Sequence, residues 1–536
     1  MLGNTIALLV YLFIISFFGF LGYRHTKTST DYLLGGRQIH PMIMALSYGA
    51  TFISTSAIVG FGGAAGTLGM GLLWLTFLNI LLGIFIAFVV FGKRTRRMGY
   101  SLDAHTFPEL LGNRFDSKFI QGFAGVVIFL FMPIYTAAVL KGGTDFIQTH
   151  FGISYEISLL FFAAVVALYV WMGGLKGVMY TDAFQGGIMF LGMIFLIIYT
   201  YSKLGGVTSA HDQLTHLFDN PDVQEQTAGL VKGGFAGWTS MPKTGSPTWW
   251  SLITTIIMGV GIGVLAQPPL VVRFMTVKSN RELNRAVVSG GIFILVTTGV
   301  AYIIGPLSNL FFFEETGSIA TIAAGGNDKI IPMFIKNYVP GWFGVIFFLA
   351  LVAAAMSTLS SQFHAMGTAV GRDVYEKAMN KKGNTILITK TGILVAILIS
   401  VTLAYLANQL DTSMQIIATG TAMFFGLCAA SFLPAYISAL FIRTISKEAI
   451  IAGMVTGFVV GIFWIFFIHE KEASSLQLCM ALFNKTSLVK ETGLAKLAMV
   501  DPIVVALPSS VIATTIGALV KKCTLSQQHL DKCFKA

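Results

Sequence analysis

Long runs of apolar residues, separated by short polar segments, extend over almost the whole chain of 536 residues. A run of roughly 20 such residues is long enough to cross the hydrocarbon layer of a membrane as a helix. Thirteen runs fit this description, at residues 5–23, 40–66, 71–92, 119–147, 155–172, 181–202, 250–272, 286–313, 341–370, 386–406, 414–442, 449–469 and 501–520. The pattern predicts an all-α polytopic membrane protein with about 13 transmembrane helices.

The composition supports this prediction, and the positions of the charged residues predict the orientation of the chain in the membrane. Hydrophobic residues make up 55% of the chain and charged residues only 11%, against about 25% charged residues in soluble domains. All eleven arginines fall in connecting segments that share one side of the predicted topology. Since basic loops stay in the cytoplasm, we expect a cell-membrane protein with its N-terminus outside, its C-terminus in the cytoplasm, and no arginine at the depth of a central site. The net charge of +11 then reflects topology and not nucleic-acid binding.

Several classes of protein lack their sequence signatures here. The chain has no GxxxxGK[ST], HExxH or GxSxG motif, which argues against an ATP-driven pump, a zinc protease or a hydrolase. Cys428, Cys479, Cys523 and Cys533 form no CxxC pair, so neither a disulfide framework nor a zinc site is expected. No enzymatic activity is predicted.

The second apolar run contains small and hydroxyl residues where a lipid-facing helix would carry leucine. Residues 47–57 read SYGATFISTSA, and Gly60, Gly62, Gly63 and Gly66 follow. We expect this segment to face a cavity, because broken helices at membrane depth are tolerated where they line a cavity or are buried in protein. The glycines alone are explained equally well by close packing of two helices.

The ninth run carries four hydroxyl side chains, Ser357, Thr358, Ser360 and Ser361. At about 100° per residue they fall within one half of a helix, with Ser357 and Ser361 one turn apart. Sodium favours about five or six neutral or anionic oxygen ligands, which hydroxyls and the carbonyls of a broken helix together supply. The alternative is that these hydroxyls bond to their own helix or to a neighbouring one.

Asp182 lies near the expected cytoplasmic start of the sixth run. Ionisable residues within membrane spans are candidates for a functional site. An aspartate at this position is equally well explained as the cap of the helix N-terminus. The residues by themselves leave both interpretations open.

Four segments make the chain resemble the sodium:solute symporter family, which includes sodium/glucose, proline, pantothenate and sialic acid carriers. They are residues 50–60, residues 173–185, Gln267-Pro268 with Arg273-Phe274-Met275, and residues 354–375, and the similarity extends over about residues 31–443. The resemblance implies the leucine-transporter fold, with two inverted five-helix repeats formed by runs 2–6 and 7–11. Runs 2 and 7 would be broken near midplane, and transport would proceed by alternating access around the breaks.

This resemblance divides the chain into six parts. They are an N-terminal extra helix and cytoplasmic loop (1–39), the first repeat (40–202), an extracellular loop (203–249), the second repeat (250–442), two peripheral helices (443–520) and a cytoplasmic tail (521–536). The central site is expected where the two repeats meet.

The family's sodium sites, carried over by position, imply ligands on the second and ninth runs. The principal site falls on the main-chain oxygens of Ala50, Ile53 and Ala354 and on the hydroxyls of Ser357 and Thr358. A second site, present in some members, falls on Asp182, Ser360 and Ser361, with Ser357 shared. Because the whole set is present, the resemblance implies Na⁺ as the coupling ion and two sodium ions per solute.

The family's solute pocket implies another group of positions. They are Phe52, Ser54, Ala57, Thr76, Asn79, Tyr135 and Thr419 or Thr421. A hexose has more hydroxyls than this lining can match, and unmatched buried polar groups are costly. Similarity to the pantothenate and monocarboxylate branch implies a small organic anion, held by Asn79, the hydroxyls and the N-termini of the broken helices. Lys141 is expected to reach the membrane interface instead.

Two alternatives stay open. One is a sodium/amino acid symporter of the proline type, although proline carriers have an aspartate in the segment where this chain has Phe52. The other is a channel or a sensor that keeps the fold without coupled transport. The full set of oxygen ligands favours coupled transport, and a flux measurement distinguishes the two.

Overall fold

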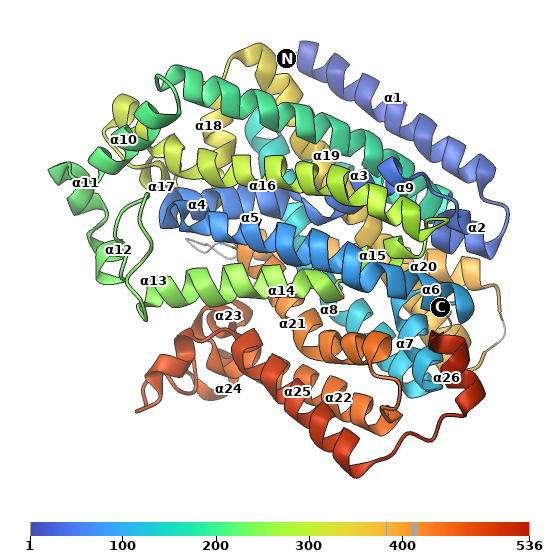
Figure 1. Ribbon diagram of the computed structural model, residues 1–536. Helices are drawn as coiled ribbons and strands as arrows, with labels where there is room; N and C mark the ends of the chain where they lie inside the picture. Colours follow the sequence, from blue (N-terminus) through green and yellow to red (C-terminus); the bar gives the residue numbers. More distant parts are fainter. Residues whose placement is uncertain (1, 382, 410–415, 535–536) are drawn as a thin grey trace.

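Helices account for every regular element that the structure, a computed structural model, contains in residues 2–381, 383–409 and 416–534, the residues it describes (Figure 1). Ten of the described helical segments are long and apolar enough to cross a membrane: Met70–Ser101, Lys118–Gln148, Gly174–Lys203, Pro247–Ala266, Asn280–Thr316, Gly341–Ala378, Thr385–Gln409, Ile417–Phe441, Lys447–Ile468 and Pro502–Val520. The second predicted run forms a bent pair, Pro41–Phe52 and Ser56–Leu68, and the first and fifth form the shorter apolar helices Leu9–His25 and Tyr155–Leu168. Each predicted run therefore coincides with a helix, which confirms the all-α polytopic fold; residues 414–415 of run eleven lie outside the described residues.

The helices carry the labels of Figure 1 and have the following bounds. They are α1 (Leu2–His25), α2 (Ser29–Leu34), α3 (Pro41–Phe52), α4 (Phe61–Leu68), α5 (Leu73–Ile80), α6 (Lys93–Ser101), α7 (Phe107–Phe115), α8 (Lys118–Phe151), α9 (Tyr155–Lys203), α10 (Val207–Leu217), α11 (Pro221–Gln226), α12 (Ala228–Lys232), α13 (Pro247–Trp250), α14 (Gly261–Gly263), α15 (Pro268–Phe274), α16 (Asn280–Thr316), α17 (Ala320–Ala323), α18 (Ile330–Tyr338), α19 (Gly341–Thr368), α20 (Thr385–Gln409), α21 (Ile416–Phe441), α22 (Lys447–Phe463), α23 (Glu470–Leu476), α24 (Leu478–Phe483), α25 (Pro502–Val520) and α26 (Gln527–Phe534). Wider π-helical turns, such as Ser56–Gly60 and Ser251–Val260, join several of them.

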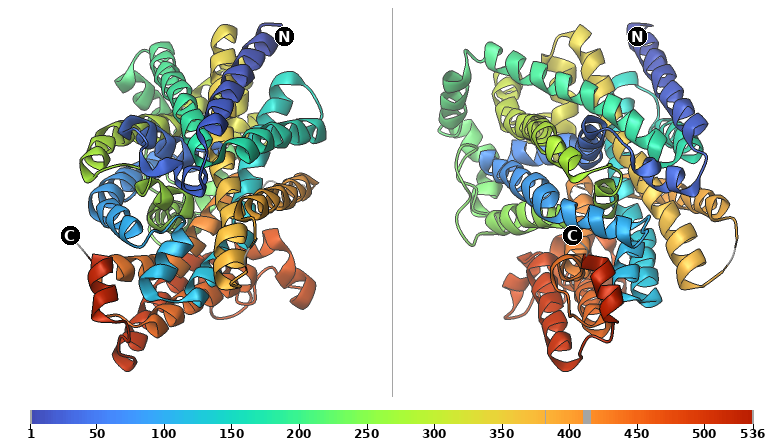
Figure 2. Two further views of the ribbon diagram at one scale, coloured as in Figure 1. Left: turned by 90° about the vertical axis from the view of Figure 1, so that its right-hand side faces the viewer. Right: turned by 45° about the vertical axis from the view of Figure 1, so that its right-hand side comes forward.

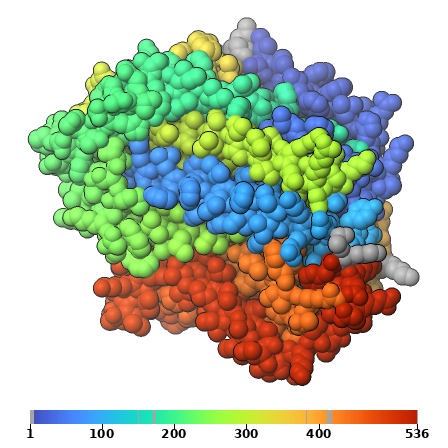
Figure 3. Space-filling view, in the orientation of Figure 1, coloured from blue at the N-terminus to red at the C-terminus, as the bar shows by residue number. Residues whose placement is uncertain are grey.

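Helices α19 and α21 form the centre of the molecule. In their membrane-crossing stretches 83% and 89% of the residues are buried, against 28% in α20 and 22% in α25. Helix α19 packs against α8, α9 and α3, while α22 and α25 pack against each other and against α21. The C-terminal helices α22 to α26 therefore form a layer along one edge of the bundle (Figures 2 and 3).

The connecting helices gather at the two ends of the bundle. Helices α10 to α12, α17, α23 and α24 lie at one end, and α2, α6, α7 and α26 lie at the other (Figure 1). The basic helix α6, with Arg94, Arg96 and Arg97, thus shares an end with Arg114 of α7. This arrangement agrees with the common side to which the sequence assigns these arginines.

Both runs that the family resemblance predicts to be broken are interrupted. The second run bends by 53° between Phe52 and Ser56. The seventh run stops at Ala266, Gln267 is extended with a ψ of 114°, and Pro268 begins the short helix α15. Proline disfavours a helical conformation in the preceding residue and suits the first position of a helix, so Gln267-Pro268 fixes the second break.

The glycines of the second run allow close helix packing. A Cβ added to Gly63 would lie 2.0 Å from the main-chain oxygen of Asn327, and one added to Gly305 of α16 would lie 2.1 Å from the main-chain oxygen of Gly62. Thr67 of α4 also donates a hydrogen bond of 2.7 Å to Oδ1 of Asn327. The connection around Asn327 therefore closes tightly over α4.

Two acidic side chains join α7 to the end of the ninth run. Glu109 accepts hydrogen bonds of 2.9 Å from Arg372 and from the main-chain N–H of His105. Burial raises the pKa of Glu109, but His105 and the Arg372 guanidinium more than offset this and bring that pKa down to about 2. Asp373 accepts through Oδ1 from Thr106, at 2.6 Å, and from Gln121, at 2.9 Å.

Candidate functional site

The break in the second run frees main-chain oxygens at its edge. Helix α3 ends at Phe52, and Ile53 takes an extended conformation with a ψ of 96°. Carbonyls in the last turn of a helix have no partner in that helix and must find one elsewhere. Here the carbonyls of Ala50 and Thr51 face the hydroxyl stripe of α19.

The predicted principal sodium ligands come together at this point. Ser357 Oγ donates a hydrogen bond of 2.8 Å to the oxygen of Ala50 and also lies 3.2 Å from the oxygen of Ala354, one turn earlier in its own helix. Thr358 Oγ1 donates a hydrogen bond of 3.0 Å to the oxygen of Thr51. All these residues are buried, and Ile53 lies directly at the break. The result is a group of neutral oxygens from two helices, the ligand type that a hard monovalent cation takes.

Asp182 does not cap a helix. It lies eight residues into the helical stretch that begins at Gly174, whose positive φ of 56° marks the kink in α9. Its Oδ2 accepts hydrogen bonds from Ser47, at 2.9 Å, and Thr51, at 3.2 Å. Ser361 donates a longer one to the same oxygen, and Ser360 Oγ lies 3.3 Å from Oδ1. The structure therefore brings Asp182, Ser360 and Ser361 together as the resemblance implies.

Arg273 corrects an expectation from the sequence. The charge pattern places every arginine outside the depth of the central site, but the side chain of Arg273 is only 1% exposed and its Nη2 lies 2.9 Å from Oδ2 of Asp182. The break at Gln267 turns α15 inward, and Asp182 supplies the opposite charge that makes burial of a guanidinium tolerable. The only sequence signal was the position of Arg273 six residues after the Gln267-Pro268 break.

A small cavity lies beside the break. It has a volume of about 10 Å³, about the space of one water molecule. Its lining consists of Phe52, Ile53, Ser54, Ala57, Phe61, Asn79, Tyr135, Val260, Thr298, Tyr302, Thr421 and Phe425. Six of the predicted pocket residues are in this group: Phe52, Ser54, Ala57, Asn79, Tyr135 and Thr421. The carboxamide oxygen of Asn79 is buried and has no hydrogen-bond partner among the described residues.

Other predicted residues lie away from this cavity. Thr76 accepts a hydrogen bond of 3.1 Å from Thr298, and Thr419 is buried without lining the cavity. Lys141 pairs with Asp145 at 2.7 Å. The cavity lining also contains residues that the sequence pattern did not predict, namely Phe61, Val260, Thr298, Tyr302 and Phe425. For Thr298, the Thr297-Thr298 pair inside an apolar run was an available signal.

A second cavity lies on the Arg273 side of the site. It has a volume of about 30 Å³, and its lining includes Arg273, Ser361, His364 and Asp373, together with His105 and Thr106 near α7. Oδ2 of Asp373 is buried and has no hydrogen-bond partner in the part of the chain that the structure describes. Because α7 lies at the end of the bundle that carries the basic helix α6, this cavity connects the Asp182 group toward that end (Figure 1).

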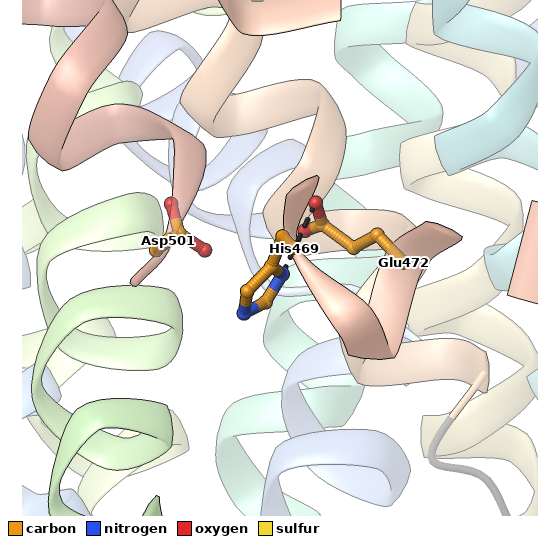
Figure 4. A group of neighbouring side chains, drawn as sticks. All are labelled: His469, Glu472 and Asp501. Atoms are coloured by element: carbon orange, nitrogen blue, oxygen red, sulfur yellow. Dashed lines mark ion pairs between the residues drawn. The ribbon is translucent and has the colours of Figure 1, made fainter. Parts of the chain in front are cut away.

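A separate buried polar group lies where α23 and α25 begin. In it the imidazole of His469 lies between the carboxylates of Glu472 and Asp501 (Figure 4), and the three ligand atoms are within 4.8 Å of one another. This spacing suits a metal ion, but Lys471 also acts on these groups electrostatically. Two carboxylates, a lysine and an imidazole that can hold a proton compensate one another, so we interpret the group as an ion-pair cluster.

Comparison with known proteins decides the family. The family model described as "Sodium:solute symporter family" matches residues 32–457. This chain belongs to the sodium:solute symporter family. The coupling ion is accordingly Na⁺, and the chain is a multi-pass membrane protein of a family of transporters.

Relatives and solved structures agree with this assignment. A sodium/proline symporter of Staphylococcus aureus is 29% identical over 471 residues, which cover 86% of this chain and 85% of that protein. A solved Na⁺-coupled sialic acid symporter, substrate-bound and outward-open, superposes with a TM-score of 0.72 at 19% identity, over 97% of this chain and 99% of that one. At this identity the superposition shows a shared fold, and it places both chains in one architecture.

Proposed function

We propose that this chain is a secondary active symporter that imports a small organic solute with sodium, and that it works by alternating access. The observation that carries the proposal is that the hydroxyls of Ser357 and Thr358 reach the main-chain oxygens of Ala50 and Thr51 at the break of the second run. In carriers built from inverted repeats, the ion and solute sites lie near the bilayer midplane and are formed by broken helices. The chain would act as a carrier and not as an enzyme.

The cavity chemistry supports a small, partly apolar solute. Phe52, Tyr135, Tyr302 and Phe425 give it aromatic walls, while the unpaired carboxamide oxygen of Asn79 can accept a hydrogen bond from a hydroxyl or N–H group of the solute and not from its carboxylate. The side chains of this lining carry no formal charge. We propose a monocarboxylate or pantothenate-like anion, with its charge balanced by the N-terminus of the helix that starts at Ser56 and by the sodium ion next to it.

A proline-like amino acid is the second candidate. The relatives described as sodium/proline symporters support it, because they share 29% of their residues with this chain over most of its length. The acceptor oxygen of Asn79 would suit the amino group of such a solute as well as it suits a hydroxyl. Proline carriers of the family have an aspartate in the segment of Phe52, which is the feature that counts against it.

Uptake into proteoliposomes tests both the transport and the solute. Purified protein would be reconstituted and supplied with an inward sodium gradient and a panel of labelled solutes: pantothenate, pyruvate, lactate, acetate, proline and other amino acids. We expect accumulation of one class above its external concentration, and loss of accumulation when potassium replaces sodium. Equilibration without accumulation would instead indicate a channel, and absence of any sodium-dependent flux would contradict the proposal.

The topology is also part of the proposal. The basic end of the bundle, with α6 and α7, would face the cytoplasm, which places the N-terminus outside the plasma membrane and α26 inside. A cysteine-labelling experiment with an impermeant maleimide tests this arrangement in intact cells. Labelling of a cysteine introduced into the loop around Lys243, together with protection of Cys523 in the tail, is the expected outcome.

A further inference from the structure

We infer that Arg273 is a tethered cation that competes with the second sodium ion for Asp182. The inference rests on the proposed sodium coupling and goes beyond it, because it assigns a role in the transport cycle to a residue outside the implied ligand set. Its basis is the set of contacts that the guanidinium makes.

The guanidinium of Arg273 takes the position of a bound cation. It contacts five acceptors: Nε lies 2.9 Å from Ser47, Nη1 lies 2.6 Å from the main-chain oxygen of Pro269, and the two protons of Nη2 are shared among Thr51 at 2.5 Å, Asp182 at 2.9 Å and Ser361 at 2.6 Å. Asp182 and Ser361 are implied ligands of the second sodium ion, and Thr51 bonds to both of them. The same oxygens would therefore serve either cation.

The charges allow only one of the two cations at a time. Among the described side chains that contact the guanidinium, Asp182 is the one carboxylate, because Ser47, Thr51 and Ser361 are neutral. A sodium ion added beside a bound guanidinium would face a like charge in a buried, poorly screened site. Sodium at Asp182 therefore requires that Arg273 move away.

The structure offers a place for the displaced side chain. Arg273 also lines the cavity of about 30 Å³, and Asp373 lines the same cavity. Because Oδ2 of Asp373 has no hydrogen-bond partner among the described residues, this carboxylate would be the acceptor for the displaced guanidinium. Arg273 would then alternate between two carboxylates, Asp182 without the second sodium ion and Asp373 with it.

This exchange explains why a buried arginine is useful in the carrier. Without a cation beside it, the buried carboxylate of Asp182 would destabilise the sodium-free protein, the state that must return for the next transport cycle. With Arg273 on Asp182 the charge is neutralised in that state. Thr51 links the change to the principal site, since its side chain bonds to Asp182 and its main-chain oxygen accepts from Thr358.

Sodium-dependent thermal stabilisation of the purified protein tests the inference without knowledge of the solute. Arg273→Gln removes the competing charge, Arg273→Lys keeps it, and Asp182→Asn removes the shared site. Sodium chloride would be titrated against choline chloride at constant ionic strength. We expect Arg273→Gln to lower the half-maximal sodium concentration by about tenfold, within the usual range of coupling between two ligands, whereas Arg273→Lys stays near the unsubstituted protein. In the Asp182→Asn background the Arg273→Gln change should have no such effect.

If Arg273 served only to hold helices together, the Arg273→Gln variant would not bind sodium more tightly. Loss of the arginine would leave the half-maximal sodium concentration unchanged or raise it, and either outcome in a monodisperse Arg273→Gln protein overturns the inference. Should that variant not fold, Asp373→Asn replaces it: loss of the acceptor for the displaced guanidinium must raise the half-maximal sodium concentration, and an unchanged or lower value overturns the inference. Failure of the proposed function looks different, because the unsubstituted protein would then show no specific response to sodium.

Discussion

The hydroxyl of Ser357 donates a hydrogen bond of 2.8 Å to the main-chain oxygen of Ala50, and so joins helix α19 to the break in the second run. The two residues are 307 positions apart in the sequence. The two oxygens are the Ser357 hydroxyl and the main-chain carbonyl of Ala50, which lies in the last turn of α3 and has no partner in that helix. A cation placed between them would hold α3 and α19 together, and ion binding that differs between two conformations shifts the equilibrium between them.

This contact predicts unequal effects of hydroxyl substitutions on sodium activation. Ser357→Ala and Thr358→Ala should each raise the half-saturating sodium concentration about tenfold, the cost of losing one buried polar contact of about 1.4 kcal/mol. Ser360→Ala should have a smaller effect, because Ser360 contacts Asp182 and the Ser357 carbonyl but not the broken helix. Sodium titrations of uptake provide the measurement. Ser400→Ala is the matched control, since this buried hydroxyl bonds only within α20; normal sodium activation in both Ser357→Ala and Thr358→Ala would remove the principal-site assignment.

The position of Asn79 in the cavity lining predicts that its substitution weakens solute binding and leaves sodium binding unchanged. Asn79→Ala should raise the half-saturating solute concentration about tenfold or more, because a buried amide that faces the cavity loses its contact with the solute. Sodium-dependent thermal stabilisation should stay nearly unchanged. Thr297→Val serves as the control, since the buried Thr297 hydroxyl bonds to the main-chain oxygen of Phe293 in its own helix and lies outside the cavity lining. A normal solute dependence for Asn79→Ala would mean that the solute binds elsewhere.

The group formed by Asp182, Ser360 and Ser361 predicts that two sodium ions accompany each solute. If the solute is a monoanion, two sodium ions carry one net positive charge inward, so uptake should generate current and respond to membrane potential by about 2.3 kcal/mol per 100 mV. Asp182→Asn should lower the Hill coefficient for sodium toward one, because the anionic ligand of the second ion is lost. This variant leaves Arg273 buried without its counter-ion, so Asp182→Asn with Arg273→Gln is the companion that restores charge balance. Electroneutral anion uptake with a Hill coefficient near one would show a single-sodium cycle.

The cluster of His469, Glu472 and Asp501 predicts a pH dependence of stability. Burial lowers the pKa of His469, but Glu472 and Asp501 outweigh it and leave that pKa above its ordinary value. Burial and the neighbouring Glu472 raise the pKa of Asp501 to about 7. In both cases the folded state binds a proton more tightly than the unfolded state does, so this contribution is fully present at acid pH and is lost as pH rises through the folded pKa values.

Thermal unfolding in detergent between pH 5 and pH 9 measures this contribution, over a window of about two units on either side of the Asp501 pKa of about 7. The melting temperature should fall with rising pH more steeply in the unsubstituted protein than in His469→Gln. His216→Gln is the control, because His216 pairs with Asp219 on the surface, where both side chains are at least 74% exposed. Identical pH profiles for His469→Gln and the unsubstituted protein would show that the cluster holds no extra proton.

The positions of the membrane helices could be predicted almost completely from the order of the residues. Each apolar run has to cross the membrane as a helix because its backbone groups find no other partners in lipid, and every run coincides with a helical segment. The hydroxyl stripe of α19 follows from helical periodicity in the same way, since Ser357, Thr358 and Ser361 share one side of any helix that forms there. The ligand positions themselves came from family resemblance, and the structure brings Ala50, Ala354, Ser357 and Thr358 into contact.

The burial of Arg273 could not be predicted from the residue order. In the sequence it stands just after an apolar run, and an arginine there is ordinarily a loop residue that anchors the span in the cytoplasm. Its burial depends on Asp182, which is 91 residues earlier, and on hydroxyls from α3 and α19 that meet it only after the bundle has assembled. Residue order was thus enough to locate the apolar helices and the hydroxyl-bearing side of α19, because both follow from local periodicity. Which charge lies against Asp182 was decided by tertiary packing, because the energy of a buried ion pair depends on partners from distant parts of the chain.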